Sequence, residues 1–234
     1  MPSPPSSPDL ASLTGRRILV TQTADFMGPA ICAGLAARGA TVLGSAEAPT
    51  DPDLPTRLAA VHGEVDALVL NLAIPAPSTP ALEVGAAEWR EAFAWLVDPL
   101  PRFLQAFAPA MVARGRGKIL VLGSASALRG MKRASTYSAA RGAQLAWVQA
   151  VGVELAPQGV QVNAIAQNFV DNPTYFPESV QQNPRFAERL AREVPLGRLV
   201  RAEEDAALVA YLCSAAADCF VGQVFPVSGG WAVR

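Results

Sequence analysis

The chain is poor in the residue types that build metal sites and disulfide frameworks. Its 234 residues include one histidine and three cysteines. Cys32, Cys213 and Cys219 are unevenly spaced and lie in apolar surroundings, so we expect them to be buried small side chains in a reducing compartment. His62 has no second histidine and no paired cysteine with which to share a ligand. The sequence therefore predicts no metal site.

Long hydrophobic runs and clusters of positive charge are also missing. Hydrophobic residues make up 51% of the chain, but the apolar runs are short of the roughly 20 residues that cross a bilayer. The net charge is −1, and no run of Lys and Arg could follow a phosphate backbone. The opening MPSPPSSPDLASL lacks the basic and apolar regions of a signal peptide. We expect a cytoplasmic protein that binds neither membranes nor nucleic acid, with residues 1–14 as a flexible tail.

From residue 15 onward, short apolar segments alternate with amphipathic ones. The segments that favour strands are RRILVT, ATVLG, VDALVLN, GKILVLGS, VQVNAIA and GQVFPVSGG. Strands that are apolar throughout are buried on both faces, which predicts a parallel sheet covered by helices. We therefore expect one α/β domain over residues 15–234, with a Rossmann-like doubly wound fold. Its site is expected beyond the carboxyl ends of the strands.

The predicted helices connect these strands, and one connection is short. They are expected at about residues 28–39, 52–63, 86–114, 137–155 and 202–215, the third carrying Pro99, Pro101 and Pro109, which can break or kink a helix. Only about 20 residues separate Gly44 from VDALVLN, whereas a complete strand–helix–strand unit takes about 30 or more. One strand–helix unit is therefore shortened or lost, and about six parallel strands are expected rather than seven.

One constellation carries the candidate chemistry. Ser124 stands where GKILVLGS leaves the sheet, and Tyr137 and Arg141 follow on one helix, four residues apart and on one face. Free tyrosine ionises near pH ~10 and is a poor base at neutral pH. A permanent cation about 4–5 Å away favours the phenolate by roughly 3–4 kcal/mol at an effective dielectric near 20. The pattern indicates a tyrosine base; the alternatives are an ordinary surface pair and a turn serine, with Ser126 as a competitor for Ser124.

The spacing of Ser124, Tyr137 and Arg141 resembles that of the catalytic Ser-Tyr-Lys of the short-chain dehydrogenase/reductases, with Arg in place of Lys. Asn71, VPLGR at 194–198 and VSGGW near the end agree with that superfamily. An arginine can take the lysine's place because it is also a permanent cation. The resemblance extends over nearly the whole chain.

Within that superfamily, the arginine variant resembles the haloalcohol (halohydrin) dehalogenases, which close vicinal haloalcohols to epoxides without a nucleotide. TQTADFMG at 21–28 matches their T-x4-F-x-G, and QNFVDNPTYFP at 167–177 resembles their halide-binding loop. The resemblance implies a homotetramer in which the helices at 86–114 and 137–155 pair across a dimer interface.

The first strand–helix turn lacks the glycines that let backbone approach a pyrophosphate. The superfamily pattern T-G-x3-G-x-G is reduced to Thr21, Gln22, Phe26 and Gly28, and the Phe26 ring would fill space that a dinucleotide needs. No acid closes the second strand to hold a ribose, since Glu47 comes only after the turn. We therefore predict no NAD(P) binding and no other cofactor.

The loop at 167–177 is the candidate anion site, because a departing halide needs a dry pocket with a few donors. The backbone N–H groups of a tight turn and the Asn168 amide are the expected donors. The candidate halide-binding residues are Gln167, Asn168, Phe169, Val170 and Phe176. The candidate walls of the substrate pocket are Phe26, Ile74, Pro75 and Met131.

The predicted reaction follows from these assignments. Tyr137 takes the proton of the haloalcohol while Ser124 holds the oxygen, and the alkoxide displaces halide to give an epoxide. In reverse, a small anion such as cyanide, azide or nitrite opens the epoxide. Two alternatives stay open: an NAD(P)-dependent short-chain oxidoreductase with an altered triad, and a non-catalytic homologue kept for assembly or binding.

Overall fold

A computed structural model describes residues 9–233. Its sheet has six strands in the order β2-β1-β3-β4-β5-β6, and every pairing is parallel. The strands are β1 (Arg17–Thr21), β2 (Thr41–Ser45), β3 (Ala67–Leu70), β4 (Gly117–Ser124), β5 (Val160–Gln167) and β6 (Val224–Val227). The prediction of a single α/β domain with six parallel strands is confirmed.

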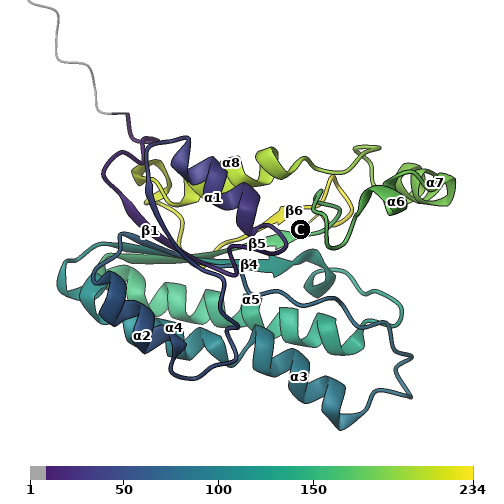
Figure 1. The fold of residues 1–234 in the computed structure, drawn as a ribbon, viewed down its shortest axis with the longest axis horizontal. Coiled ribbons are helices and arrows are strands. Elements are labelled where there is room, and N and C mark those ends of the chain that lie inside the picture. Colours follow the sequence, from purple (N-terminus) through teal and green to yellow (C-terminus); the bar gives the residue numbers. More distant parts are fainter. Residues whose placement is uncertain (1–8, 234) are drawn as a thin grey trace, which may run out of the picture.

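Helices cover both faces of the sheet (Figure 1). On one face lie α1 (Gly28–Ala36) and α8 (Ala202–Leu212). The other face is covered by α2 (Leu54–His62), α3 (Ala86–Leu96), α4 (Pro99–Ala113) and α5 (Ser135–Leu155). Two short helices, α6 (Glu178–Gln181) and α7 (Pro184–Glu193), extend from one end of the domain. The sheet is thus buried on both sides, as its apolar strands require.

The helices differ from the prediction in two places. The stretch at 86–114 is two helices, because Pro99 opens α4 at its first position after a break at Val97 and Asp98. Pro109 lies inside α4 without ending it. The pair α6 and α7 was not expected. A start signal for α7 is present in the sequence, since Asn183 caps the helix by accepting a hydrogen bond from Arg185 N.

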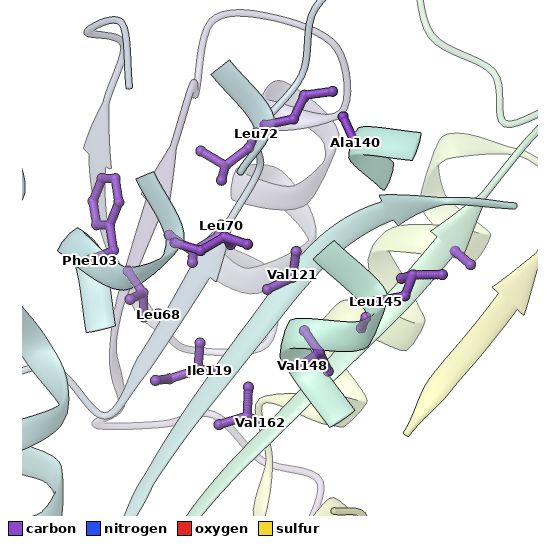
Figure 2. Packing of buried hydrophobic residues seen from close by; sticks show 14 of the residues in the cluster. Leu68, Leu70, Leu72, Phe103, Ile119, Val121, Ala140, Leu145, Val148 and Val162 are labelled. Atoms are coloured by element: carbon purple, nitrogen blue, oxygen red, sulfur yellow. The ribbon is translucent and has the colours of Figure 1, made fainter. Parts of the chain in front are cut away.

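Successive residues of a strand pack into two separate apolar cores, one on each face of the sheet. Leu68, Leu70 and Val121 pack with Phe103 and Val148 on the side of α4 and α5 (Figure 2). Their immediate neighbours in the same strands, such as Val69 and Leu120, pack on the side of α1 and α8. Each fully buried side chain of this size contributes about 1.5–3 kcal/mol. This double burial is why the strands are apolar at every position rather than at alternate ones.

The N-terminal boundary differs from the prediction. Leu13 is fully buried in the core beside α1, and its N–H donates to the carbonyl of Arg38 at 3.2 Å. The carbonyl of Leu10 accepts from Ala216 N at 3.0 Å. The described part of the predicted flexible tail is therefore anchored to the domain, and residues 1–8 lie outside the described residues.

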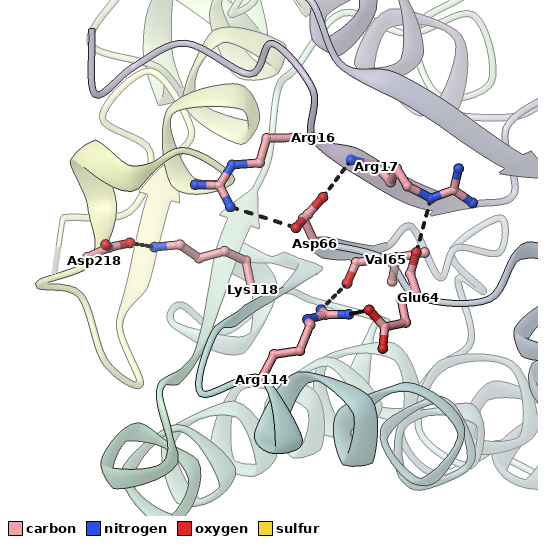
Figure 3. A network of polar contacts seen from close by, with 8 residues as sticks. All are labelled: Arg16, Arg17, Glu64, Val65, Asp66, Arg114, Lys118 and Asp218. Carbon is pink, nitrogen blue, oxygen red and sulfur yellow. Dashed lines mark hydrogen bonds and ion pairs between the residues drawn. The ribbon is translucent and has the colours of Figure 1, made fainter. Parts of the chain in front are cut away.

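Charged pairs gather at the amino ends of the strands, opposite the edge where a site is expected (Figure 3). Asp66 Oδ2 accepts from Arg17 N at 2.9 Å, and Arg114 pairs with Glu64 at 2.9 Å. Lys118 pairs with Asp218. The carboxylates of Glu64 and Asp218 are open to solvent, and pairs with an exposed partner are worth about 0–1 kcal/mol each. These contacts connect strands and loops at the amino edge, whereas the candidate catalytic residues lie at the carboxyl edge.

The three cysteines differ in exposure. Cys213 is buried and Cys32 half-buried, but Cys219 is exposed, so burial of all three was wrong. Burial raises the pKa of the Cys213 thiol to about 12. Across residues 9–233, no cluster of three or more His, Cys, Asp or Glu side chains could hold a metal ion. No helix within that range is long and apolar enough to cross a membrane.

Candidate active site

The carboxyl ends of the strands meet around a cavity of about 250 Å³. Its walls include Asn71 after β3, Ser124 at the end of β4 and Gln167 at the end of β5. Tyr137 and Arg141 enter it from α5. Ligand pockets commonly span about 300–1,000 Å³, so this cavity suits a substrate of few heavy atoms.

Ser124 lines the cavity, and its hydroxyl proton is not used by the neighbouring Ser126. Its Oγ accepts two hydrogen bonds, from Ser126 N at 3.2 Å and from Ser126 Oγ at 3.0 Å. A hydroxyl has one proton to donate, and neither contact uses that of Ser124. Ser126 is buried behind Ser124 and does not line the cavity. Of the two serines, Ser124 is the one placed to donate to a bound oxygen.

Arg141 lies against the Tyr137 ring inside the protein. Its Cζ is 5.0 Å from the ring centre, and the residue is only 3% exposed. Nη1 donates to the carbonyls of Leu72 and Leu122 at 2.8 and 2.9 Å. Among the described residues no carboxylate pairs with Arg141, and the oxygens that accept its hydrogen bonds are uncharged. The i,i+4 spacing therefore does bring the cation next to the Tyr137 ring.

Gln144 fixes the arginine and was missed in the sequence. Its Oε1 accepts from Arg141 Nη1 at 2.9 Å, and its Nε2 donates to the carbonyl of Leu96 at 2.6 Å. That carbonyl is available because the break before Pro99 directs Leu100 N to the carbonyl of Val97. The break between α3 and α4 therefore contributes to the placement of the cation.

The five candidate halide-binding residues all line the cavity: Gln167, Asn168, Phe169, Val170 and Phe176. Phe169 has a left-handed φ of +52°, and its N–H donates to Asn168 Oδ1 at 2.9 Å. Gln167 Nε2 is directed to Asp205 at 2.6 Å. The donors left for an anion are the Asn168 amide nitrogen and the N–H of Val170, for which the described residues provide no acceptor. A left-handed residue between such donors is typical of an anion nest.

Aromatic rings close the far side of this loop. The rings of Phe169 and Phe176 stack with centres 6.0 Å apart, and Phe186 follows Phe176 at 5.5 Å. Arg189 of α7 lines the cavity with its Cζ 5.1 Å from the Phe169 ring centre. The sequence did not indicate Arg189, because α7 was not predicted.

The predicted substrate walls divide between two cavities. Phe26 and Met131 line the cavity that contains the triad, whereas Ile74 and Pro75 line an adjoining one of about 480 Å³. Phe26 stands between the two and lines both. Ile74 and Pro75 therefore lie apart from the triad, on the other side of Phe26, and their role as substrate walls stays a prediction.

Tyr175 is a further residue of the cavity that the sequence did not single out. Its hydroxyl lies 3.3 Å from that of Tyr137 and also contacts the carbonyl of Ile74. Its ring centre is 5.4 Å from that of Phe26. Burial raises the pKa of Tyr175 well above the usual tyrosine range, and the neighbouring Tyr137 acts in the same direction while Arg141 opposes it.

Asp205 lies behind the anion loop and is fully buried. Its Oδ2 accepts from Gln167, and its Oδ1 has no hydrogen-bond partner in the described residues. Burial raises the pKa of Asp205 to about 7, with the hydrogen bond from Gln167 opposing the shift. Below that pH the carboxyl is uncharged, which removes a negative charge from the back of the candidate halide site.

Comparison with known proteins shows the family to which this fold belongs. A family profile described as enoyl-(acyl carrier protein) reductase matches residues 52–232. Galactitol 2-dehydrogenase (L-tagatose-forming) of Cereibacter sphaeroides is 33% identical over 94% of this chain and 96% of its own. The chain therefore belongs to the short-chain dehydrogenase/reductase superfamily.

Two solved structures are similar in a more specific way. One, described as a dehalogenation enzyme, has a TM-score of 0.88 and 32% identity, covering 94% of this chain and 99% of its own. The other is a halohydrin dehalogenase bound to ethyl (2S)-oxiran-2-ylacetate, with a TM-score of 0.83 and 27% identity over 93% of this chain and 98% of its own. The chain is thus similar both to dehydrogenases and to dehalogenases.

The crevice where this superfamily would hold a dinucleotide is crossed by a side chain. The chain leaves β1 for β2 and returns to β3 on the other side of β1, so the crevice lies between β1 and β3. Gln22 spans it, with Nε2 donating to the carbonyl of Ala73 at 3.0 Å and Oε1 accepting from Ala73 N at 2.6 Å. Gln22 and Phe26 hold left-handed φ angles of +45° and +51°, as glycines would.

At the outer end of the crevice, the acidic side chain that follows β2 is already paired with an arginine. Beyond the end of β2, Glu47 pairs with Arg57 at 2.7 Å instead of standing ready for a ribose. Arg57 pairs in addition with Asp51 at 2.8 Å. Gly28 keeps the turn tight, since a Cβ there would come within 2.3 Å of the Gln22 carbonyl oxygen. The residues present therefore do not fit a dinucleotide.

Proposed function

We propose that the protein is a cofactor-independent haloalcohol dehalogenase that closes vicinal haloalcohols to epoxides and opens epoxides with small anions. The observation that carries this proposal is the content of one small cavity. The hydroxyls of Ser124 and Tyr137, a cation with no carboxylate partner among the described residues, and two free N–H donors converge there, while Gln22 crosses the neighbouring nucleotide crevice. This set serves proton transfer and anion release without a hydride carrier.

In the forward direction, Tyr137 as phenolate accepts the proton of the substrate hydroxyl, and Ser124 donates to the same oxygen. The resulting alkoxide attacks the neighbouring carbon, so that a C–O bond forms while the carbon–halogen bond breaks. The halide leaves with the bonding pair toward the Asn168 amide and the Val170 N–H. Tyr137 then returns its proton to solvent before the next turnover. Arg141, whose Cζ is 5.0 Å from the ring centre, is the cation placed to stabilise the phenolate.

In the reverse direction, the roles are exchanged. A small anion such as cyanide, azide, nitrite or halide occupies the loop of Gln167–Val170 and attacks an epoxide carbon. Neutral Tyr137 gives its proton to the opening oxygen, which Ser124 holds. The aromatic side chains Phe169 and Phe176 keep water from the anion, which makes it a better nucleophile.

The second candidate is an NAD(P)-dependent oxidoreductase, which the 33% identity to a dehydrogenase favours. It predicts micromolar binding of NAD(H) or NADP(H) in calorimetric titration, whereas the dehalogenase proposal predicts none. A non-catalytic homologue predicts neither dinucleotide binding nor turnover. The titration and the activity assay together separate the three.

The test is release of halide from a panel of short vicinal haloalcohols in the absence of nucleotide. We expect turnover by the wild-type protein and none by Tyr137→Phe, with Tyr211→Phe as a matched control, because its hydroxyl contacts Ala216 on the surface. Absence of halide release across bromo- and chloroalcohols of two to four carbons would contradict the proposal.

We also propose a homotetramer whose dimer interface joins α4 and α5 of two copies. The outer face of α5 supports this, because Ala146, Ala150 and Val153 are exposed and apolar there. Val153 is 69% exposed in the single chain. Analytical ultracentrifugation tests the assembly, and Val153→Glu is expected to shift it toward smaller species.

A further inference from the structure

Two tyrosine hydroxyls face each other in the candidate active site, and only one of them is used by the mechanism above. We propose that Tyr175 is a positioning residue that holds the hydroxyl proton of Tyr137 in the free enzyme and is displaced by the substrate oxygen. This inference rests on the proposed role of Tyr137 as the proton acceptor. Its basis is the direction of two hydrogen bonds.

The carbonyl of Ile74 sets that direction. A carbonyl oxygen only accepts, so the Tyr175 hydroxyl donates its one proton to Ile74. Toward Tyr137, 3.3 Å away, Tyr175 therefore has only oxygen lone pairs to offer. Tyr137 must be the donor in this contact, and it can donate only while it is protonated. The contact thus favours the neutral phenol over the phenolate.

Tyr175 itself remains protonated under the conditions of the reaction. Burial raises its pKa well above the usual tyrosine range. Arg141 is four residues from Tyr137 on the same helix and lies over the Tyr137 ring. The cation is therefore placed to assist Tyr137, and of the two tyrosines Tyr137 is the one that ionises.

The contact between the hydroxyls is long enough to be replaced. Its 3.3 Å lies beyond the usual 2.5–3.0 Å of a hydroxyl pair. In this proposal, the substrate hydroxyl that donates to the Tyr137 oxygen takes the place of the Tyr175 oxygen. Tyr175 N donates to Asn172 Oδ1 at 2.9 Å, and its ring rests on Phe26, so the loop offers a defined resting position.

The charged residues around the two tyrosines line two adjoining cavities. Arg141 from α5 and Arg189 from α7 are the charged residues that line the triad cavity. Asp25, Glu88 and Glu91 line the adjoining cavity beyond Phe26. None of these charges changes when the Tyr175 hydroxyl is removed, so the effect of Tyr175→Phe on the ionisation of Tyr137 isolates the hydroxyl contact.

The first test needs no turnover. The chain has three tyrosines, Tyr137, Tyr175 and Tyr211, so tyrosinate absorbance can be followed residue by residue. In a Tyr211→Phe background, adding Tyr175→Phe is expected to move the Tyr137 ionisation about half to one unit toward lower pH. Tyr175→Leu, which also lacks the hydroxyl, should give a shift in the same direction. An unmoved ionisation, or one moved toward higher pH, would overturn the proposal.

The second test separates the free enzyme from the substrate complex. The pH dependence of kcat/KM reports groups of the free enzyme, and that of kcat reports groups of the complex. For ring closure, Tyr175→Phe should move the rising limb of kcat/KM to lower pH and leave that of kcat in place. A limb of kcat that moves equally would show that Tyr175 still contacts Tyr137 with substrate bound, and would overturn the displacement. Failure of the proposed function looks different, since the wild type would then release no halide while the tyrosinate titration would still give its answer.

Discussion

The turn after β1 and the end of β4 with the start of α5 lie at the same edge of the sheet, yet they relate to the superfamily pattern in opposite ways. At the turn, the backbone shape is kept and the side chains are changed, since Gln22 and Phe26 hold φ angles suited to glycine. At the triad, the chemical groups are kept, as a serine, a tyrosine and a cation. A turn shape alone therefore does not show that a nucleotide binds.

The physical cost of the two regions also differs. A residue other than glycine at a left-handed φ costs about 1–2 kcal/mol. At Gln22 this is offset by two hydrogen bonds to Ala73 across the crevice. The triad bears a different cost, because Arg141 is buried as a cation with carbonyl partners in place of a carboxylate. The strained turn places Gln22 across the crevice between β1 and β3 and so closes it. The unpaired charge of Arg141 instead lies beside Tyr137 in the open cavity.

The largest effect should come from the triad. Tyr137→Phe removes the only proton acceptor in the proposed reaction, and the rate should fall by at least about 10²-fold in both directions. Ser124→Ala should lose most of the activity through the oxygen contact. Halide release and epoxide opening measure both, with circular dichroism as the control for folding. A Tyr137→Phe protein with more than a few per cent of the wild-type rate would assign the base to another residue.

Arg141 should set the pH at which ring closure operates. Arg141→Gln removes the positive charge beside the Tyr137 ring, so the rising limb of the rate against pH should move toward higher pH. Arg141→Lys keeps a cation and should retain part of the effect. Epoxide opening uses the neutral phenol and should fall with pH in the mirror sense. If Arg141→Gln folds and the limb stays in place, the arginine is structural.

Substitution of Gln22 in the turn after β1 should change the free energy of unfolding. Gln22→Ala keeps the left-handed strain and leaves the Ala73 N–H and carbonyl unpaired, which should lower the free energy of unfolding by about 2–3 kcal/mol. Gln22→Gly loses the same bonds but relieves the strain, so it should be about 1 kcal/mol more stable than Gln22→Ala. Urea unfolding compares the two. Equal stability would mean that the left-handed φ carries no cost here.

The smallest effect concerns Asp205, behind the anion loop. Its pKa is raised to about 7 by burial, while an unfolded aspartate ionises near pH ~3.9. The unfolded chain therefore loses this proton first, and the folded state becomes less favourable as the pH rises from about 4 to about 7. Asp205→Asn cannot ionise, so its stability relative to wild type should be greater at pH 8 than at pH 4. The same gain at both pH values in urea unfolding would contradict this.

The parts of the candidate site that could be predicted depend on the spacing of residues close together in the sequence. The position of Arg141 relative to Tyr137 depends on one helix, and the lost strand–helix unit depends on a count of residues between two apolar segments. Tyr175 and Asp205 each contact a residue 38 positions away, Tyr137 and Gln167 respectively. No periodicity connects such positions, because the loop and the helix that carry them meet only in the folded chain.

The sequence by itself determined the six-stranded sheet and selected Ser124, Tyr137 and Arg141 as candidates, because hydrophobic period and helical spacing act over a few residues. It also identified Gln22 and Phe26 where the superfamily pattern has glycines. Only the tertiary structure decided that Gln22 reaches across to Ala73 and that Tyr175 meets Tyr137. These outcomes depend on where separate strand ends and loops converge, and convergence is set by packing of the whole core rather than by any local pattern.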